Sequence, residues 1–242
     1  MLAAACAADR KAPAADASGS TTTIGAGTTS TAAPAAATLD GPARYVAHGP
    51  ATATGVALTF HVAGDPTRAR QLFDAAKRAS APLTLFLVGT FVTAQPDLVA
   101  SLAADGHELA NHTATHQTMG RLTASQIADE ITRCRDELTQ ATASPGDWFR
   151  PSGMDVPTPV VLRQAAAAGY GTVVGYDIDP HDYQDPGAAS VEQRVAAAIH
   201  PGAIVSLHTD HPGTIDALPH IVDAIHRAGL RPMTVGQLLA SA

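Results

Sequence analysis

Residues 106–116 read GHELANHTATH, in which a short apolar stretch, 108–111, runs directly into a polar segment that carries His112 and His116. Two histidines four residues apart direct both imidazoles toward one point if the segment forms a helical turn. Neutral imidazole suits zinc and its neighbours in the first transition row. On this spacing alone the alternative is a polar turn with two exposed histidines, so the flanking sequence has to decide between them.

The chain on both sides of this segment alternates short, apolar, β-branched runs with helical stretches from Gly55 onward. This alternation is typical of a parallel α/β sheet or barrel, and we predict about seven β/α units. Three hydroxyl residues, each three positions before a Gln, predict helix starts at Thr123/Gln126, Ser190/Gln193 and Thr234/Gln237. The predicted strands are Val56–Phe60, Leu83–Val88, Glu108–Asn111, Asp147–Arg150, Thr172–Tyr176, Ala203–Leu207 and Leu230–Met233.

Residues capable of chemistry cluster at one end of these strands. At or just past the carboxyl ends lie His61, His112, Arg150, Asp177 and His208. Parallel barrels build their active sites at that end. We therefore expect these side chains to meet in one site at the mouth of a barrel.

The overall composition limits the classes of partner that the protein can bind. The formal net charge is -7 and no Lys/Arg cluster is present, which argues against binding to nucleic acid. No apolar run approaches the roughly eighteen residues that a transmembrane helix needs. We expect one catalytic domain at 41–242 that acts as a monomer.

The first forty residues differ from the rest. Residues 2–6, ending in Cys6, look like the end of a bacterial lipoprotein signal, although an ordinary alanine-rich start is the alternative. Residues 7–40 are rich in Ala, Thr, Ser, Gly and Pro without apolar periodicity, which predicts a flexible tether. We expect an extracytoplasmic protein, secreted or anchored at the membrane only through a lipid on Cys6.

The run GHELANHTATH resembles the second motif of the polysaccharide deacetylases, the NodB-like family 4 of carbohydrate esterases, and the likeness extends over roughly residues 55–240. The other matching segments are Val56–Phe60 for the first strand, Phe149–Gly153 for a shortened third motif, Asp179–Tyr183 for the fourth and Ile204–His208 for the fifth. The resemblance implies a distorted (β/α)7-type barrel with parallel strands and outer helices. It also implies hydrolysis of N-acetyl groups on amino sugars with a divalent metal.

The resemblance assigns roles to individual residues. It makes His112 and His116 metal ligands and His208 a general acid. Asp182 would orient His208, with Asp177 and Asp179 as alternatives from the same acidic run. Arg150 would hold the general base in position, and Tyr183 and Leu207 would form the walls of the pocket for the acetyl group. The alternative for Arg150 and Asp182 is that they form a structural ion pair with each other. The alternative for Tyr183 and Leu207 is that they pack in the hydrophobic core.

The first motif departs from the family. There the first strand ends in two aspartates, a general base and then a metal ligand, whereas this chain has His61 and Val62. We favour Asp65, brought back by the loop at Gly64, as the missing ligand, since two histidines and one carboxylate leave a position open for water. His61 is then the base, with an ordinary pKa of about 6.5. Alternatively His61 is the third ligand, or Asp65 caps the helix that begins at Pro66.

These observations predict a metal-dependent hydrolase that removes N-acetyl groups from peptidoglycan, chitin-like or other extracellular polysaccharides. Zinc is the expected metal, with cobalt, nickel and manganese as alternatives. A hydrolase of a small non-sugar amide is one alternative function. The other is a catalytically silent wall- or metal-binding protein that lost the two aspartates, as His61 and Val62 suggest.

Overall fold

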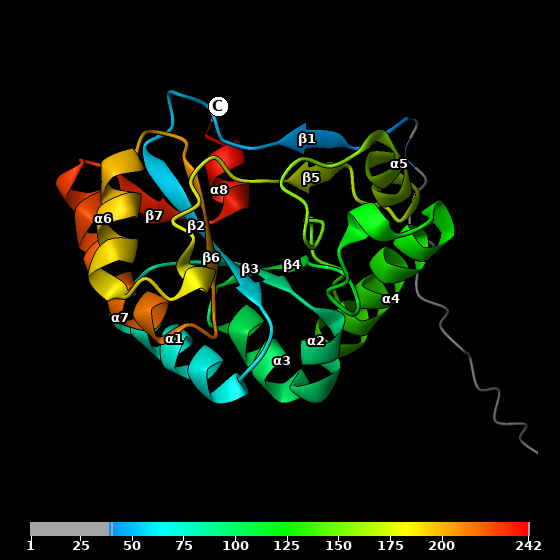
Figure 1. Ribbon diagram of the computed structural model, residues 1–242, viewed down its shortest axis with the longest axis horizontal. Coiled ribbons are helices and arrows are strands. Elements are labelled where there is room, and N and C mark those ends of the chain that lie inside the picture. Colours follow the sequence, from blue (N-terminus) through cyan, green and yellow to red (C-terminus); the bar gives the residue numbers. More distant parts are fainter. Residues whose placement is uncertain (1–38, 40, 242) are drawn as a thin grey trace, which may run out of the picture. The chain divides into compact units, whose positions relative to one another are not determined.

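The computed structural model describes residues 39 and 41–241. Parallel strands form its centre and helices cover their outer side, with α1 to α3 below the strands in Figure 1, α6 and α7 at the left and α4 and α5 at the right. The strands are β1 (Arg44–Val46), β2 (Gly55–Val62), β3 (Thr84–Leu87), β4 (Glu108–Asn111), β5 (Thr172–Val174), β6 (Ile204–His208) and β7 (Arg231–Met233). The helices are α1 (Pro66–Arg78), α2 (Gly89–Ala94), α3 (Pro96–Ala104), α4 (Ala124–Thr142), α5 (Pro159–Ala167), α6 (Ala188–Ala198), α7 (Pro212–Arg227) and α8 (Val235–Leu239), with 3-10 turns η1 (Met119–Arg121) and η2 (Asp182–Gln184).

The strands form an open, curved surface in which every ladder is parallel. One sheet has the order β4-β3-β2-β6, with β7 also paired to β2, and a second sheet joins β1 to β5. Single bridges from Phe149 to Asn111 and from Phe149 to Val173 connect the two sheets. The fold is thus the expected distorted barrel, although the barrel is not closed by continuous ladders.

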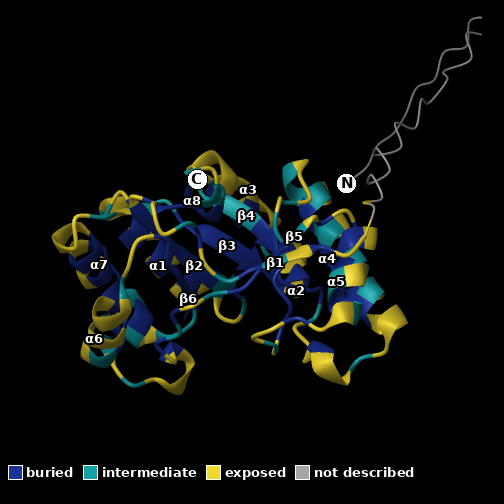
Figure 2. Cartoon of the chain, turned by 90° about the horizontal axis from the view of Figure 1, so that it is seen from above, coloured by how far each residue is buried: buried dark blue, intermediate teal, exposed yellow. Residues whose placement is uncertain are grey.

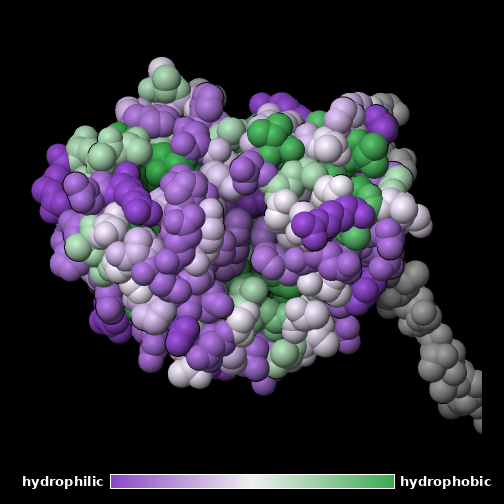
Figure 3. Space-filling view, in the orientation of Figure 1, coloured by the Kyte–Doolittle hydropathy of each residue, from purple (hydrophilic) through white to green (hydrophobic). Residues whose placement is uncertain are grey.

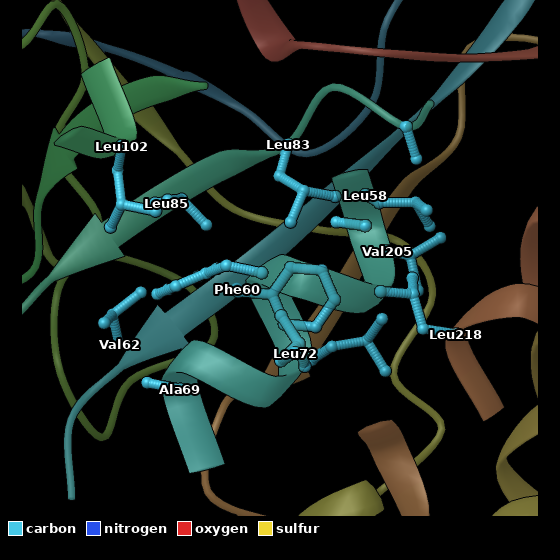
Figure 4. Packing of buried hydrophobic residues seen from close by; sticks show 14 of the residues in the cluster. Leu58, Phe60, Val62, Ala69, Leu72, Leu83, Leu85, Leu102, Val205 and Leu218 are labelled. Atoms are coloured by element: carbon cyan, nitrogen blue, oxygen red, sulfur yellow. The ribbon is translucent and has the colours of Figure 1, made fainter. Parts of the chain in front are cut away.

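Side-chain alternation along β2 separates an inner from an outer face, since successive residues of a strand point to opposite sides. Leu58, Phe60 and Val62 belong to the large hydrophobic cluster that packs against the outer helices. Figure 4 shows them in one layer with Ala69 and Leu72 of α1. Ala57 lies in a different cluster, with Phe86, on the inner face. The next inner positions along β2 are Thr59 and His61, so the strand delivers His61 to the inside of the barrel at its open end.

Burial follows this layering. In Figure 2 the strands are buried through the middle of the molecule, and exposed residues lie on the outer faces of the helices and on loops. The surface seen in Figure 3 is largely hydrophilic, with apolar groups in separate patches. No helix in the described part of the chain is both long and apolar enough to cross a membrane.

Most predicted elements are present, and three differ. Residues 147–150 form single bridges at Phe149 and no ladder, because this segment meets each neighbour at one residue only. Strand β1 was not expected, since three residues after Gly41 are too few to show a period of two. Ser190 lies inside α6, which begins at Ala188 after Gly187, so its hydroxyl is not an N-cap.

Two helix starts have the expected reciprocal capping. At the start of α4, the Thr123 side chain accepts from Gln126 N and the Gln126 side chain accepts from Thr123 N–H. At the start of α8, Thr234 and Gln237 form the same two hydrogen bonds. The proline at the start of α5 follows Thr158, whose hydroxyl accepts from Val161 N. Cys134 is buried within α4 and is a free thiol, while Cys6 and the predicted tether lie outside the described residues.

The contrast between Thr123 and Ser190 gives a stability prediction. Thr123→Ala removes the hydroxyl that accepts from Gln126 N at α4, while the backbone N–H of residue 123 can still donate to the Gln126 side chain. The free energy of unfolding should fall by about 1 kcal/mol. Ser190→Ala should change it by less than about 0.5 kcal/mol, because that hydroxyl caps nothing. Urea unfolding of the two variants measures both values, and equal losses would contradict the assigned start of α6.

Candidate active site

The two histidines of the central motif lie on a loop after β4, not on the helical turn that their spacing suggested. Thr113 and His116 have φ angles of 71° and 60°, a left-handed conformation that is uncommon for such residues. The loop is held by local hydrogen bonds, because Thr113 N donates to Asn111 Oδ1 at 2.9 Å and His116 N donates to Thr113 Oγ1 at 3.2 Å. Asn111 is buried and donates to Ile131 O at 2.9 Å. The turn is therefore fixed to the strand that precedes it.

This loop brings the Nε2 atoms of His112 and His116 within 3.2 Å of each other. Nδ1–H of His112 donates to Arg150 O at 2.9 Å, so its Nε2 carries the lone pair. Two nitrogens about 2.0–2.1 Å from a tetrahedral metal lie about 3.3 Å apart, so the pair fits two corners of such a site. In the metal-free protein the same separation suits an N–H···N hydrogen bond between the rings.

Burial lowers the pKa of both imidazoles, and for His112 the nearby His116 lowers it further. The pKa of His116 is also lowered by His208 and is raised in part by Asp210 and Glu130. Low pKa values keep both rings neutral near pH 7, which is the form that binds metal.

The third ligand that a catalytic zinc site normally has is absent from this arrangement. Among residues 39 and 41–241, no three or more His, Cys, Asp or Glu side chains are grouped closely enough to hold a metal. Val62 lies in the outer hydrophobic cluster. Two imidazoles thus fit a divalent metal, and the described residues do not complete the set.

Asp65 is used elsewhere, contrary to the role that we favoured for it. Its side chain accepts from Thr67 N at 2.8 Å as the N-cap of α1, and its carboxylate lies 3.9 Å from Arg68. The side chain is 48% exposed. Aspartate is a strong N-cap and Pro66 fits the first turn, so local helix capping determines its position.

Arg150 is completely enclosed at the floor of the site. Its guanidinium stacks on the Phe86 ring, with Cζ 4.0 Å from the ring centroid. Burial lowers its pKa to about 9, which leaves it charged at neutral pH. None of the ion pairs found in the described part of the chain includes Arg150, so the alternative of an Arg150–Asp182 ion pair is wrong. Its hydrogen-bond partners are Val174 O at 3.0 Å, Thr59 Oγ1 at 2.9 Å, Gly175 O at 2.7 Å and His61 Nε2 at 3.1 Å.

His61 lies between the two histidines of the loop and His208. Its ring centroid is 4.2 Å from that of His112 and 4.6 Å from that of His208. Its Nδ1 is 3.0 Å from His208 Nε2, and its Nε2 faces Arg150. Both nitrogens are therefore engaged, and neither is directed to the His112–His116 pair as a third metal ligand. Burial is the main reason why the pKa of His61 is well below its ordinary value, and the charge of His112 lowers it further.

His208 is oriented by Asp182. Nδ1–H of His208 donates to Asp182 Oδ1 at 2.7 Å, and its backbone N donates to Oδ2 at 2.8 Å. Thr214 Oγ1 donates to the same Oδ2 at 2.7 Å. Burial acts to raise the pKa of Asp182, but these hydrogen bonds and the charge of His208 outweigh it and lower the pKa below 3.8. His208 is 20% exposed, so its ring can meet a ligand at the mouth.

The other acidic candidates have different contacts. Asp177 accepts from Ile204 N at 2.8 Å and pairs with His200 at 2.9 Å. Asp179 pairs with His181 at 3.2 Å. Asp177 and Asp179 therefore hold loops beside the site, and Asp182 is the residue whose carboxylate accepts the hydrogen bond from His208.

Tyr183 and Leu207, the expected pocket walls, are placed differently. The Tyr183 side chain is exposed, and its ring centroid lies 5.6 Å from that of His208. Leu207 is completely buried in the outer hydrophobic cluster. Only Tyr183 therefore borders the mouth, and Leu207 packs in the core, as the alternative for it supposed.

Asp210 is a residue near the site that sequence reasoning missed. It acts on His116 electrostatically, and its carboxylate lies 3.4 Å from His211 Nε2. Its place two residues after His208 at the end of β6 was the available signal, because that strand end faces the mouth.

The lowered pKa values of His61, His112 and His116 predict how stability depends on pH in the presence of a chelator. Their pKa values are lowered in the folded state, so below about pH 6.5 the unfolded chain binds protons that the folded chain does not. The free energy of unfolding should fall as the pH drops from 7 to 5, and His61→Gln should reduce that slope. Chemical denaturation across this range measures it. The exposed His220 offers the control, and an equal effect of His220→Gln would contradict the assignment.

Comparison with known proteins supports the same family. A family model described as polysaccharide deacetylase matches residues 48–173. The chain is 33% identical over 199 residues to a chitooligosaccharide deacetylase of Bradyrhizobium sp., covering 76% of this chain and 90% of that protein. It is 32% identical over 194 residues to a peptidoglycan-N-acetylglucosamine deacetylase of Bacillus cereus, covering 76% and 87%.

Solved structures agree with this match. The fold is similar to that of a pseudoenzyme of carbohydrate esterase family 4 from Bacillus anthracis, with a TM-score of 0.75, 26% identity and coverage of 81% of this chain and 69% of that one. A mutant of that pseudoenzyme, described as having restored enzymatic activity, also has a TM-score of 0.75. With its two-histidine loop, its Asp182–His208 pair and its parallel barrel, this chain belongs to the polysaccharide deacetylase family, family 4 of the carbohydrate esterases.

Proposed function

We propose that residues 41–242 form a deacetylase domain that hydrolyses N-acetyl groups of amino-sugar polymers, such as peptidoglycan or chitin-like chains. The observation that carries this proposal is the convergence of the His112–His116 pair and the Asp182–His208 pair on the two sides of His61. Relatives named as chitooligosaccharide and peptidoglycan deacetylases support the same substrate class.

His112 and His116 are the residues that would hold a divalent metal, for which zinc is our first choice and cobalt, nickel or manganese are alternatives. Such a metal would polarise the acetamide carbonyl and lower the pKa of water. Arg150 places a buried positive charge beneath the site, and its hydrogen bond to Thr59 fixes it to β2.

His208 is the group that we propose for proton transfer. Asp182 keeps the proton on Nδ1, so Nε2 is the atom that exchanges protons with the reactants. His208 Nε2 takes one proton from the attacking water while its oxygen bonds to the acetyl carbon. The C–N bond then breaks, and the same proton passes to the departing amine, leaving a free amino sugar and acetic acid, which loses its remaining proton to solvent to give acetate. An amine leaves poorly without a proton, and such transfer typically contributes about 10²–10⁴-fold to the rate.

Tyr183 is the residue best placed to contact the sugar. Its side chain is 46% exposed and lies edge-on to His208. A half-exposed aromatic ring at the mouth provides an apolar surface for a sugar face. A wall at this position suits a long polymer that lies across the mouth.

A second candidate function is a catalytically silent, wall-binding homologue. The observation that favours it is the pair His61 and Val62, because Val62 packs in the outer core and the described residues offer no third metal ligand. This function predicts binding of metal or polymer without release of acetate.

The location that we propose is outside the cytoplasm, where these polymers occur, with the domain either secreted or held by a lipid on Cys6 through the tether. The name of the peptidoglycan deacetylase relative supports this location. We further propose that the domain acts as a monomer.

Zinc binding tests the ligand assignment. His112→Ala or His116→Ala should abolish binding of one zinc per chain in equilibrium dialysis, because each removes half of the protein ligands. Asp65→Asn should leave zinc affinity unchanged, since Asn also caps a helix and the Asp65 carboxylate serves α1. If Asp65→Asn lost zinc as His112→Ala does, Asp65 would be a ligand after all.

Acetate release separates the two candidate functions. The zinc-loaded protein should release acetate from chitooligosaccharides or peptidoglycan, and His208→Ala should lower that rate by about 10²–10⁴-fold. Asp182→Asn should also lower it, because its amide group can place an N–H against His208 Nδ1 and disturb the tautomer. Zinc bound by the protein without acetate from either polymer would favour the silent homologue.

A further inference from the structure

The hydrogens of Arg150 determine which nitrogen of His61 carries a proton. NH1 of Arg150 has two hydrogens and two partners, Thr59 Oγ1 at 2.9 Å and His61 Nε2 at 3.1 Å. The Thr59 hydroxyl donates its own hydrogen to Val205 O at 2.6 Å, so its oxygen accepts from Arg150. A guanidinium has no acceptor. His61 Nε2 therefore accepts and holds its lone pair toward Arg150.

The opposite end of the His61 ring then has to donate. A neutral imidazole without hydrogen on Nε2 carries it on Nδ1, and Nδ1 of His61 lies 3.0 Å from His208 Nε2. In the resting protein His208 Nε2 accepts from His61, so the hydrogen of His208 is on Nδ1, which donates to Asp182 at 2.7 Å. This bond from the neutral His61 ring has to break before His208 Nε2 can take a proton from water. All hydrogen bonds run in one direction, from the Arg150 cation through two neutral rings to the Asp182 anion. The reverse tautomer of His61 would set its N–H against an N–H of Arg150.

We propose that His61 is a positioning residue that joins Arg150 to His208 and holds the His208 ring in line, and that it is neither general base nor metal ligand. His61 has no free acceptor, because Nε2 is occupied by Arg150 and Nδ1 carries hydrogen. This differs from the base role that the sequence suggested for it. The catalytic part of the inference rests on the proposed deacetylase function, whereas the tautomer does not.

The tautomer can be observed without activity. Two-bond ¹H–¹⁵N correlation spectra of the full chain, labelled in histidine and kept metal-free near neutral pH, distinguish the Nδ1–H from the Nε2–H form. We expect the signals that disappear in His61→Gln to have the Nδ1–H pattern. An Nε2–H pattern or a doubly protonated ring for His61 would overturn the proposal.

Two substitutions then separate positioning from base catalysis. A glutamine at position 61 has a carbonyl to accept from Arg150 and an N–H to donate to His208, but it cannot take up a proton near neutral pH. Leucine has a similar size and neither group. We expect kcat of His61→Gln to stay within about tenfold of the unchanged protein, whereas His61→Leu should lose more than about 10²-fold, the scale of a lost proton-transfer contribution.

The outcomes are distinct from those that test the proposed function. Loss of more than about 10²-fold in both variants, with zinc binding intact, would show that His61 acts as a base and would overturn the inference. If the unchanged, zinc-loaded protein released no acetate, the proposed function would fail, and the NMR pattern alone would still decide the arrangement of His61.

Discussion

The buried charge of Arg150 is the constraint on which the rest of the site depends. A guanidinium enclosed in protein is costly unless its N–H groups are satisfied, and here the partners are two carbonyls, one hydroxyl and one imidazole, with no carboxylate. These partners come from β2 and from the end of β5, and the Phe86 ring of β3 supports the charge from one face. Satisfying one side chain thus aligns three strands at the barrel mouth.

The orientation of the histidines follows from this arrangement. Arg150 contributes its backbone oxygen to His112 and its side chain to His61, so one residue orients the first histidine of the loop after β4 and the ring beside His208. Asp182 closes the line at the opposite end through His208. A cation and an anion at the two ends of a hydrogen-bonded line favour the same direction for every hydrogen bond between them. The site is therefore preorganised before any ligand binds.

His61 and Val62 stand where the family resemblance implies two aspartates, and this difference bears on the chemistry more than on the fold. An imidazole at position 61 still fills the space between Arg150 and His208, whereas a valine at position 62 adds to the outer core and contributes no ligand. His61 would thus present an N–H to His208 where the family resemblance implies a carboxylate, and a metal bound by His112 and His116 would have fewer protein ligands than that resemblance implies. A pseudoenzyme with the same fold is among the similar structures, which shows that the scaffold can persist without activity.

The sequence by itself determined the strand periodicity, most strand positions, the two capping boxes and the convergence of His112, His116 and His208 at strand ends, because these depend on local spacing and on the parallel arrangement. Only the tertiary structure decided that Asp65 caps a helix and that His61 hydrogen-bonds to Arg150 and His208. Capping a helix and binding a metal suit the same aspartate, and the choice depends on where α1 begins relative to the mouth. The role of His61 depends on Arg150 and His208, which lie 89 and 147 residues away in the chain. Local sequence patterns carry no information on which nitrogen meets which donor across such separations, since packing of the whole barrel sets those distances.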